Sequence, residues 1–330
     1  MPNETMIKKI LATTPLVEVF VRTIYYANIK YLKNIVPIYR VNPYLNLKKK
    51  NKKVSNKKKI DFQKILNFVS KKLLKKGDLV ILISSYKNLK STGYSPQQII
   101  DSFKKIIGNK GTLAMSARPD FKIDLENYIT KKKDRKIYFY DVKKTKCNTG
   151  IIPQTMLMMK NSVRSRNPIN SMVAIGPLAN KIMSKNLINN ETLPHGRNSS
   201  WYKCVLNNAK ILAIGVDLVQ GATITKTVED VYCDVWPLKN WYSKKKYFIK
   251  DGKFKKKFIL KERSPKWSLH YAERTMCKDF IKSGILSSYN FDGLSIEFAE
   301  SKKIFSYLKN RKNRSYPYFY TKYDLINYIS

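Results

Sequence analysis

The sequence contains very few residues of the kinds that bind metals or form disulfides. Its 330 residues include two histidines, His195 and His270, and four cysteines at positions 147, 204, 233 and 277. No two cysteines are spaced as a Cys-x-x-Cys pair, so the sequence indicates neither a zinc site nor a dithiol, and we expect no metal. Few, widely spaced cysteines are typical of a reduced intracellular protein. We therefore expect a cytoplasmic location.

Acidic residues are also scarce. The chain has 23 acidic and 65 basic residues, which gives a formal net charge of +42. Such a charge would suit a nucleic-acid-binding protein or an anionic cofactor. The lysines are spread along almost the whole chain and far outnumber the arginines, however. We therefore expect no nucleic-acid partner.

Long uncharged apolar runs are absent as well. The apolar and aromatic stretch 10–39 is interrupted by Glu18, Arg22, Lys30 and Lys33, so we expect no transmembrane helix. A dense lysine run follows at residues 48–59. Two interpretations of residues 1–59 remain open: a solvated linker, or peripheral contact with an anionic membrane at its inner face. We treat 1–59 as an N-terminal extension and 60–330 as the folded domain.

The remainder of the chain has the composition and pattern of an α/β domain. Hydrophobic residues make up 43% of the sequence. An amphipathic helix is predicted from residue 60, a buried strand at 79–83, a helix from Ser95-Pro96 to 107, and a strand at 112–116. This order implies a parallel strand pair with a covering helix. Later segments predict a strand at 210–216, a hairpin turn at Asp251-Gly252 and a helix at 270–283.

The stretch 164–177 reads RSRNPINSMVAIGP. Asn167-Pro168 predicts a turn, and residues 172–175 predict a buried strand. By itself this pattern fits either an ordinary loop and core strand or a rigid ligand-binding turn. The stretch resembles the R-S-x-H-P-x-x-S-x-x-A-x-G signature of the aminoglycoside 3-N-acetyltransferase family, whose members depend on acetyl-coenzyme A. The signature histidine is replaced by Asn167.

Four further segments resemble the family in the same order along the chain. Ser84-Ser85 matches a small-hydroxyl pair that lies near coenzyme A in the family, with Ile83 in place of a preceding histidine. Tyr140-Asp141 followed by Thr149-Gly150 matches a second motif. Residues 196–201 match a third, with Ser200 in place of proline. Residues 223–229 match the family's T-x-x-H-x-x-E pattern through Thr223 and Glu229, with Lys226 in place of histidine.

The resemblance covers roughly residues 60–310 and implies a three-layer fold with a mixed central sheet covered by helices. It implies transfer of an acetyl group from acetyl-coenzyme A to an amine of an aminoglycoside or another amino sugar. The site residues that follow are Glu229, Asn167 and His195 for catalysis, Ser84, Ser85, Arg164 and Ser171 for the cofactor, and Asp141, Thr223 and Lys226 for the substrate.

The identity of the base stays open in the sequence. The family's base is the histidine of the His-Pro motif, oriented by the glutamate that aligns with Glu229, and an asparagine cannot titrate. Either Glu229 or His195 could replace it. The alternative is a member that binds coenzyme A or an amino sugar without turnover. Each residue also has a plain structural interpretation: a surface ion pair for Lys226 and Glu229, a turn-capping role for Asp141 and a core position for His195.

Overall fold

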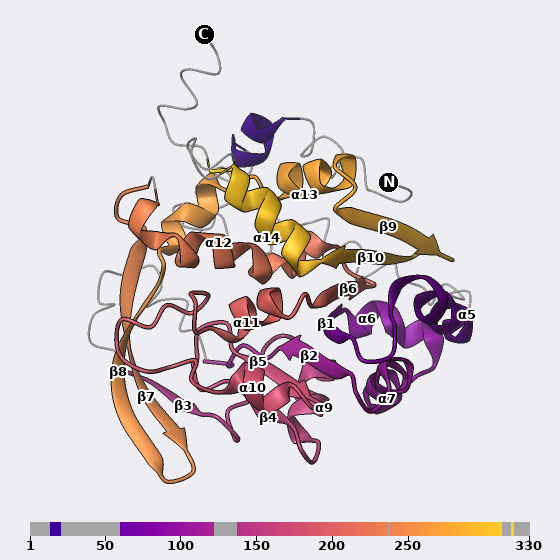
Figure 1. Ribbon diagram of the computed structural model, residues 1–330, viewed down its shortest axis with the longest axis horizontal. Helices are drawn as coiled ribbons and strands as arrows, with labels where there is room; N and C mark the ends of the chain where they lie inside the picture. The colour runs from indigo at the N-terminus through magenta and orange to yellow at the C-terminus, as the bar shows by residue number, and fades with distance from the viewer. Residues whose placement is uncertain (1–13, 21–59, 122–136, 237, 312–317, 320–330) are drawn as a thin grey trace, which may run out of the picture.

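A seven-stranded mixed sheet runs through the centre of the molecule (Figure 1). The structure is a computed structural model that describes residues 14–20, 60–121, 137–236, 238–311 and 318–319. The strand order is β4-β5-β2-β1-β6-β10-β9, in which β2, β1 and β6 are parallel. The other pairings are antiparallel. The strands are β1 (Leu79–Ser84), β2 (Thr112–Ser116), β4 (Val163–Arg164), β5 (Met172–Ile175), β6 (Lys210–Ile214), β9 (Leu286–Phe291) and β10 (Leu294–Glu300).

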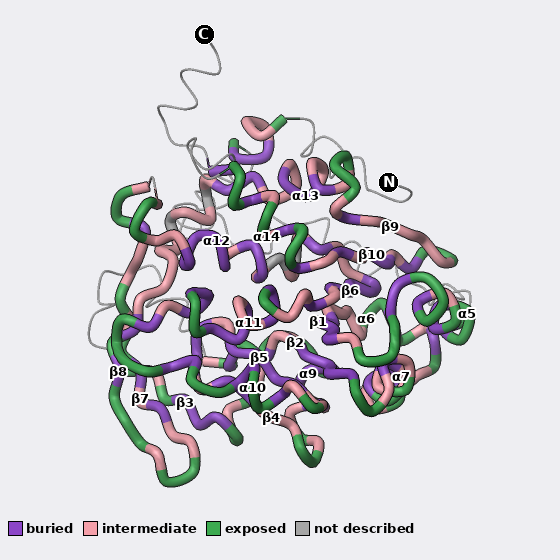
Figure 2. The backbone as a smooth tube through the Cα atoms, viewed as in Figure 1, coloured by how far each residue is buried: buried purple, intermediate pink, exposed green. Residues whose placement is uncertain are grey.

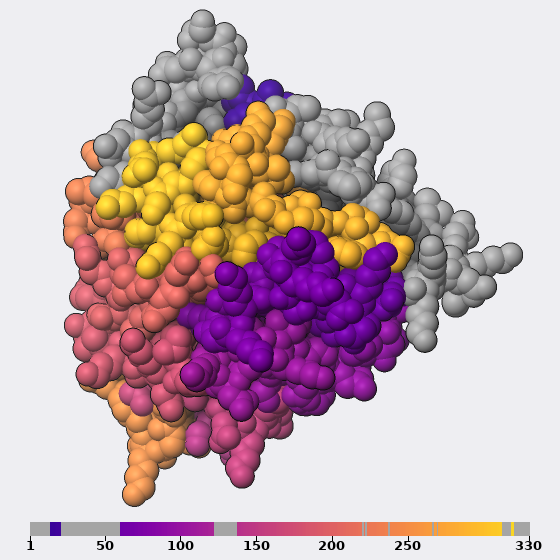
Figure 3. All heavy atoms as spheres, turned by 45° about the vertical axis from the view of Figure 1, so that its right-hand side comes forward, coloured from indigo at the N-terminus to yellow at the C-terminus, as the bar shows by residue number. Residues whose placement is uncertain are grey.

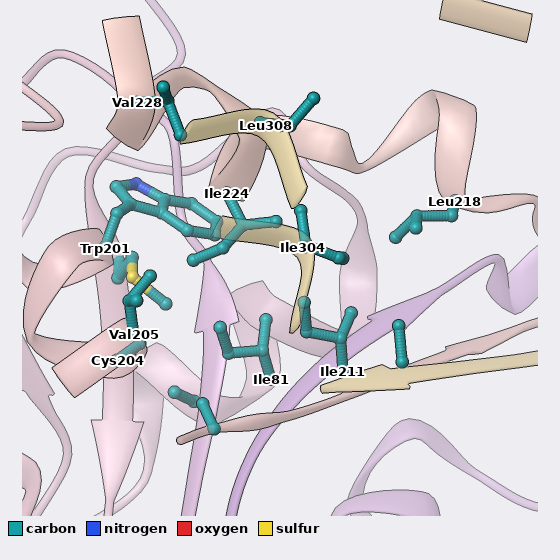
Figure 4. Close-up of a cluster of buried hydrophobic side chains, with 14 of the residues drawn as sticks. Ile81, Trp201, Cys204, Val205, Ile211, Leu218, Ile224, Val228, Ile304 and Leu308 are labelled. Carbon is teal, nitrogen blue, oxygen red and sulfur yellow. The ribbon is translucent and has the colours of Figure 1, made fainter. Parts of the chain in front are cut away.

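Helices cover both faces of this sheet because its central strands are apolar on both sides. In β1, Leu79 and Ile81 join one buried cluster, whereas Val80 and Leu82 join the other. The first cluster includes Trp201, Ile211 and Ile304 (Figure 4). It is covered by α10 (Ala179–Met183), α11 (Ser200–Leu206), α12 (Lys226–Val231), α13 (Glu273–Lys282) and α14 (Ser301–Asn310).

The second cluster is covered by helices from the first half of the chain. Figure 2 shows the buried backbone that lies between the two helical layers. The covering elements are α5 (Phe62–Phe68) with the π-helical turn Val69–Leu73, α6 (Tyr86–Leu89) with the 3-10 turn Lys90–Thr92, α7 (Pro96–Ile107) and α9 (Ile151–Met158). The expected α/β fold with a mixed central sheet is therefore confirmed.

Helix α7 forms where the sequence predicts it. Ser95 accepts a hydrogen bond from the Gln98 backbone amide, and the Gln98 side chain accepts one from the Ser95 amide. This capping box satisfies amide donors that the first helical turn would leave unpaired. The helix ends at Gly108, which has a φ of 66° that glycine adopts without steric cost. The β1-α7-β2 unit predicted from the sequence is thereby confirmed.

A second, three-stranded sheet lies beside the first and is formed by β3 (Ile137–Asp141), β7 (Tyr242–Asp251) and β8 (Phe254–Arg263). Strands β7 and β8 form the predicted hairpin, and its turn contains Gly252 at a φ of 61°. The tip of this hairpin projects from the body of the molecule (Figures 1 and 3). The inner face buries aromatic side chains that include Tyr140, Tyr247 and Phe258. The remaining elements are the 3-10 turns Leu218–Gln220, Ala222–Thr225, Cys233–Val235 and Pro265–His270.

Part of the segment assigned to the N-terminal extension contacts the folded domain. Residues 15–20 are helical, and the Glu18 side chain is buried. Its carboxylate accepts hydrogen bonds from the backbone amides of Arg274 and Thr275, at the start of α13. Residues 1–13 and 21–59, which include the lysine run, lie outside the described residues, so the membrane contact predicted for 1–59 stays a prediction. Within the described ranges, no helix has the length and apolar character needed to cross a bilayer.

Candidate active site

A cavity of about 330 Å³, here called the His195 cavity, opens between the end of β2, the signature loop, α12 and the small sheet. Its lining comprises Arg118, Pro119, Phe121, Tyr138, Asn148, Pro168, Ile169, Asn170, His195, Lys226, Lys245, Tyr247, Glu262, Arg263, Pro265 and Ser268. Of the sequence-predicted site residues, this cavity brings together His195 and Lys226.

His195 is held by the carboxylate of Asp230. The His195 Nδ1 lies 2.9 Å from Asp230 Oδ2, and the His195 backbone amide donates to the same oxygen. The Tyr242 hydroxyl donates to Asp230 Oδ1 at 2.9 Å. Both members of the pair are almost completely buried, with side-chain exposures of 4% and 3%. Helix α12 thus supplies an acid that fixes the imidazole ring in one orientation.

The second ring nitrogen of His195 meets an amide. The Asn170 Nδ2 lies 3.0 Å from His195 Nε2. Because Nδ1 faces a carboxylate, we assign the ring proton to Nδ1, which leaves Nε2 as the acceptor for the Asn170 amide. Burial lowers the pKa of His195, and Asp230 offsets part of that effect. A neutral imidazole that lines the cavity and has one unprotonated nitrogen is suited to act as a general base.

Glu229 does not line the cavity, because Arg263 engages its carboxylate. The Arg263 Nη1 donates to Glu229 Oε1 at 3.0 Å, and both side chains are at least 90% buried. The guanidinium also lies over the rings of Trp241, Tyr271 and Phe319. Burial raises the pKa of Glu229, whereas Arg263 and then Lys226 lower it. A carboxylate in hydrogen-bond contact with a buried guanidinium is poorly placed to accept a proton from a ligand.

Lys226 carries an amine that faces the cavity. The residue is half-buried, and within the described part of the chain its side-chain amine forms neither a hydrogen bond nor an ion pair. The expected surface ion pair with Glu229 is absent there, since Glu229 pairs with Arg263. Burial lowers the pKa of the Lys226 amine, and the Arg263 charge lowers it further. The amine is therefore available to a ligand.

Two predicted cofactor residues bind backbone carbonyls. Arg164 donates to the carbonyl oxygens of Ala117 and Thr145, each at 2.5 Å, and lies over the Tyr140 ring. The Ser171 hydroxyl donates to the Ala117 carbonyl at 2.5 Å. Both side chains are buried and neither lines the cavity. In this structure they fix the segment after β2 to the signature loop.

Asn167 is bonded within its own loop. Its Oδ1 accepts a hydrogen bond from the Ile169 amide at 3.0 Å, and its Nδ2 donates to the Asn186 carbonyl at 3.5 Å. The side chain does not line the cavity, whereas Pro168, Ile169 and Asn170 do. The signature loop therefore presents Asn170, three residues further along, to His195.

The other predicted residues lie away from the cavity lining. Ser84 ends β1 and Ser85 precedes α6, and the buried Ser84 hydroxyl has no partner in the described chain. Asp141 accepts from the amides of Lys143 and Lys144, each at 3.0 Å. Burial raises the pKa of Asp141, but these amides and the Lys250 amine outweigh it and hold the pKa below its usual value. Thr223 belongs to the 3-10 turn before α12. Among the described residues, no cluster of three or more His, Cys, Asp or Glu is placed to hold a metal ion.

Three residues of the candidate site were not predicted from the sequence. Asp230 directly follows the matched Glu229, and Asn170 lies inside the signature, so both could have been found by asking which neighbours can reach a histidine. Arg263 lies 34 positions from Glu229, at the end of β8 in the three-stranded sheet, whereas Glu229 is on α12. No local pattern signals its role.

Comparison with known proteins agrees with this architecture. The sequence profile described as aminoglycoside 3-N-acetyltransferase matches residues 81–310. Aminoglycoside N(3)-acetyltransferase IX of Micromonospora chalcea is 25% identical over 154 residues, which are 44% of this chain and 53% of that protein. The match thus spans about half the length of that relative.

Solved structures share the fold. The structure of AAC-IIIb in a binary complex with CoASH has a TM-score of 0.63 at 15% identity, covering 76% of this chain and 97% of the other. AAC-VIa bound to sisomicin has a TM-score of 0.61 at 15% identity, with 76% and 98% covered. The fold is that of the aminoglycoside acetyltransferases. Because the family profile matches more than half of its length, the chain belongs to the aminoglycoside 3-N-acetyltransferase family.

Proposed function

We propose that this protein is a coenzyme-A-dependent N-acetyltransferase that transfers the acetyl group of acetyl-coenzyme A to an amine of an aminoglycoside or another amino sugar. Family membership supports the reaction class, and a structural relative described in complex with CoASH supports the co-substrate. A relative described as bound to sisomicin supports an aminoglycoside or similar acceptor. The observation that carries the proposal is the buried His195–Asp230 pair on the cavity wall.

His195 takes the role of the base that Asn167 cannot fill. The acceptor amine replaces the Asn170 amide as the donor to Nε2 and loses a proton to it as its nitrogen attacks the thioester carbonyl. Asp230 stabilises the resulting imidazolium. The C–S bond then breaks, and the imidazolium returns the proton to the departing thiolate. The Asn170 amide, once displaced from Nε2, is a donor for the oxyanion that forms on the carbonyl oxygen.

A test of the base measures thiol release from acetyl-coenzyme A with a panel of amino-sugar acceptors. We expect His195→Asn to lower kcat by about 10²–10⁴-fold, the range for loss of a positioned base. Asp230→Asn should also lower kcat, because it removes the group that orients the ring. His270→Asn is the matched control, since it makes the same change at the other histidine and outside the cavity lining.

The pH profile gives a second readout. Because burial lowers the pKa of His195, the neutral base persists below pH 6.5, the usual histidine value, and activity should fall only at more acidic pH. A carboxylate placed at Nε2 by Asn170→Asp would favour the imidazolium and should move this acid limb to higher pH. Full activity of His195→Asn would rule out the assigned base. Stabilisation of the wild type by acetyl-coenzyme A without thiol release for any amine would favour the binding-only alternative.

A further inference from the structure

The charged side chains that line the His195 cavity are predominantly cationic. Arg118, Lys226, Lys245 and Arg263 face a single lining acid, Glu262. Lys245 forms an ion pair with Glu262, and Arg263 forms one with Glu229 behind the wall. Within the described residues, Arg118 and Lys226 have no carboxylate partner. Two cationic side chains of the lining are thus available to bind a ligand. The lining has no carboxylate that is available in the same way.

This distribution of charge is unfavourable for a polycation. An acceptor with several ammonium groups would lose water around them on entering the cavity, and a desolvated charge needs a partner of opposite sign. The one lining carboxylate is already engaged by Lys245. The ammonium groups would instead meet Lys226 and Arg118.

The same two residues are well arranged for an anion. Arg118 is exposed at the cavity wall, where its Nε donates to Asn148 Oδ1 at 3.0 Å, which leaves the terminal guanidinium nitrogens for a ligand. Lys226 is half-buried, and the charge of Arg118 is near enough to lower the pKa of its amine. A guanidinium and an ammonium group directed at one space are a common arrangement for binding a phosphate.

We propose that the acceptor is a phosphorylated amino sugar, whose phosphate binds Lys226 and Arg118 while its amine faces His195. This inference rests on the acetyltransferase function proposed above. The phosphates of coenzyme A are a second source of the same chemistry. They are separated from the thioester by the whole pantetheine arm, whereas Lys226 and Arg118 share one cavity of about 330 Å³ with His195.

The test compares acceptors that differ in charge, using the full-length chain and thiol release from acetyl-coenzyme A. We expect kcat/KM for glucosamine 6-phosphate to exceed that for glucosamine by at least about tenfold, and sisomicin to be the poorest of the three. Arg118→Gln and Lys226→Gln should each raise KM for glucosamine 6-phosphate by about tenfold and leave KM for acetyl-coenzyme A unchanged. Arg197→Gln is the matched control, because this exposed arginine lies outside the cavity lining.

Three results would overturn the proposal: equal or better use of glucosamine, a preference for sisomicin, or a rise in KM for acetyl-coenzyme A in the Arg118 and Lys226 variants. The last would assign both cations to the cofactor. If no amine is acetylated, the proposed function fails. Calorimetry with the same compounds then still decides whether the cavity prefers a phosphorylated amino sugar. Tighter binding of glucosamine 6-phosphate than of glucosamine, lost in Lys226→Gln, supports it, and equal binding overturns it.

Discussion

Asn167 occupies the position at which the resemblance predicts a catalytic histidine, and its side chain has a structural task. Both ends of its amide are hydrogen-bonded within or next to the loop, to the Ile169 amide and the Asn186 carbonyl. The backbone amide of Asn167 also donates to Asn186 Oδ1. A residue held at so many points shapes the loop and does not move easily toward a substrate. The family's histidine position is thereby used to present Asn170.

The sequence alone predicts that Asn167→His restores a base that depends on Glu229. The structure changes this expectation. The substitution would remove the hydrogen bonds of the Asn167 side chain, which is buried with an exposure of 4%. The loss should lower the free energy of unfolding by about 1–3 kcal/mol. The imidazole ring would lie outside the cavity lining, so we expect no gain in acetyl transfer. Thermal unfolding and thiol-release assays measure the two effects, with Asn198→His, at an exposed position, as the control.

A gain in rate would contradict this geometry. If the gain were also cancelled by Glu229→Gln, the family's dyad would be re-formed, and Arg263 would have to release the Glu229 carboxylate. The distance of 3.0 Å between Arg263 Nη1 and Glu229 Oε1 argues against that release.

Motif spacing is local, so it can predict an element. The motif at 223–229 predicted a helix that carries Lys226, and the structure begins α12 at Lys226 and places this residue in the cavity lining. The pairing of Glu229 with Arg263 could not be read in this way. It depends on how the end of β8 meets α12, and that contact is set by tertiary packing rather than by spacing along the chain.

At the scale of elements, helix α13 depends on a residue from the other end of the sequence. Its first amides lack partners within the helix, as at every helix start. Glu18 accepts hydrogen bonds from the amides of Arg274 and Thr275, at 2.9 and 3.1 Å, and from the Thr275 hydroxyl at 3.2 Å. A carboxylate at a helix N-terminus is also favoured by the helix dipole.

We therefore predict that Glu18→Ala lowers the free energy of unfolding by about 1–2 kcal/mol, the usual cost of a lost cap. Urea unfolding measures the change. Glu191→Ala is the control, because the ion pair of Glu191 with Lys261 is exposed and should contribute less than about 1 kcal/mol. Equal stability of Glu18→Ala and the wild type would show that the Glu18 cap does not stabilise α13.

Elements were predicted correctly where the apolar pattern and the caps agree, as in α7. Strand β3 was not predicted from 117–140. Ile137 and Phe139 are exposed on one face, so the segment lacks the polar-out alternation of a half-buried strand. Its partner β7 lies about a hundred residues further along. The apolar run at 172–175 likewise indicates that β5 is buried on both faces, but not that β5 runs antiparallel to β2.

At the scale of the whole molecule, the net charge of +42 and the ion pairs have opposite effects on the stability of the folded state. Exposed lysines repel one another, which destabilises the compact state. Salt screens the interaction between exposed charges that are farther apart than the Debye length, about 8–10 Å at physiological ionic strength. Buried pairs are screened much less. The Glu229–Arg263 pair is of the buried kind. Salt should therefore weaken the repulsion more than it weakens the attractive pairs.

The expected outcome is that raising sodium chloride from about 0.02 M to about 0.5 M increases the Tm, because the Debye length falls below the spacing of most surface charges. Scanning calorimetry at pH 7 measures the shift. Replacing chloride with sulfate at equal ionic strength is the control for specific anion binding, since a cation-lined cavity would give sulfate an extra effect that Lys226→Gln removes. A Tm that falls with added salt would mean that partly exposed ion pairs such as Arg166–Asp251, at 2.8 Å, outweigh the repulsion among the lysines.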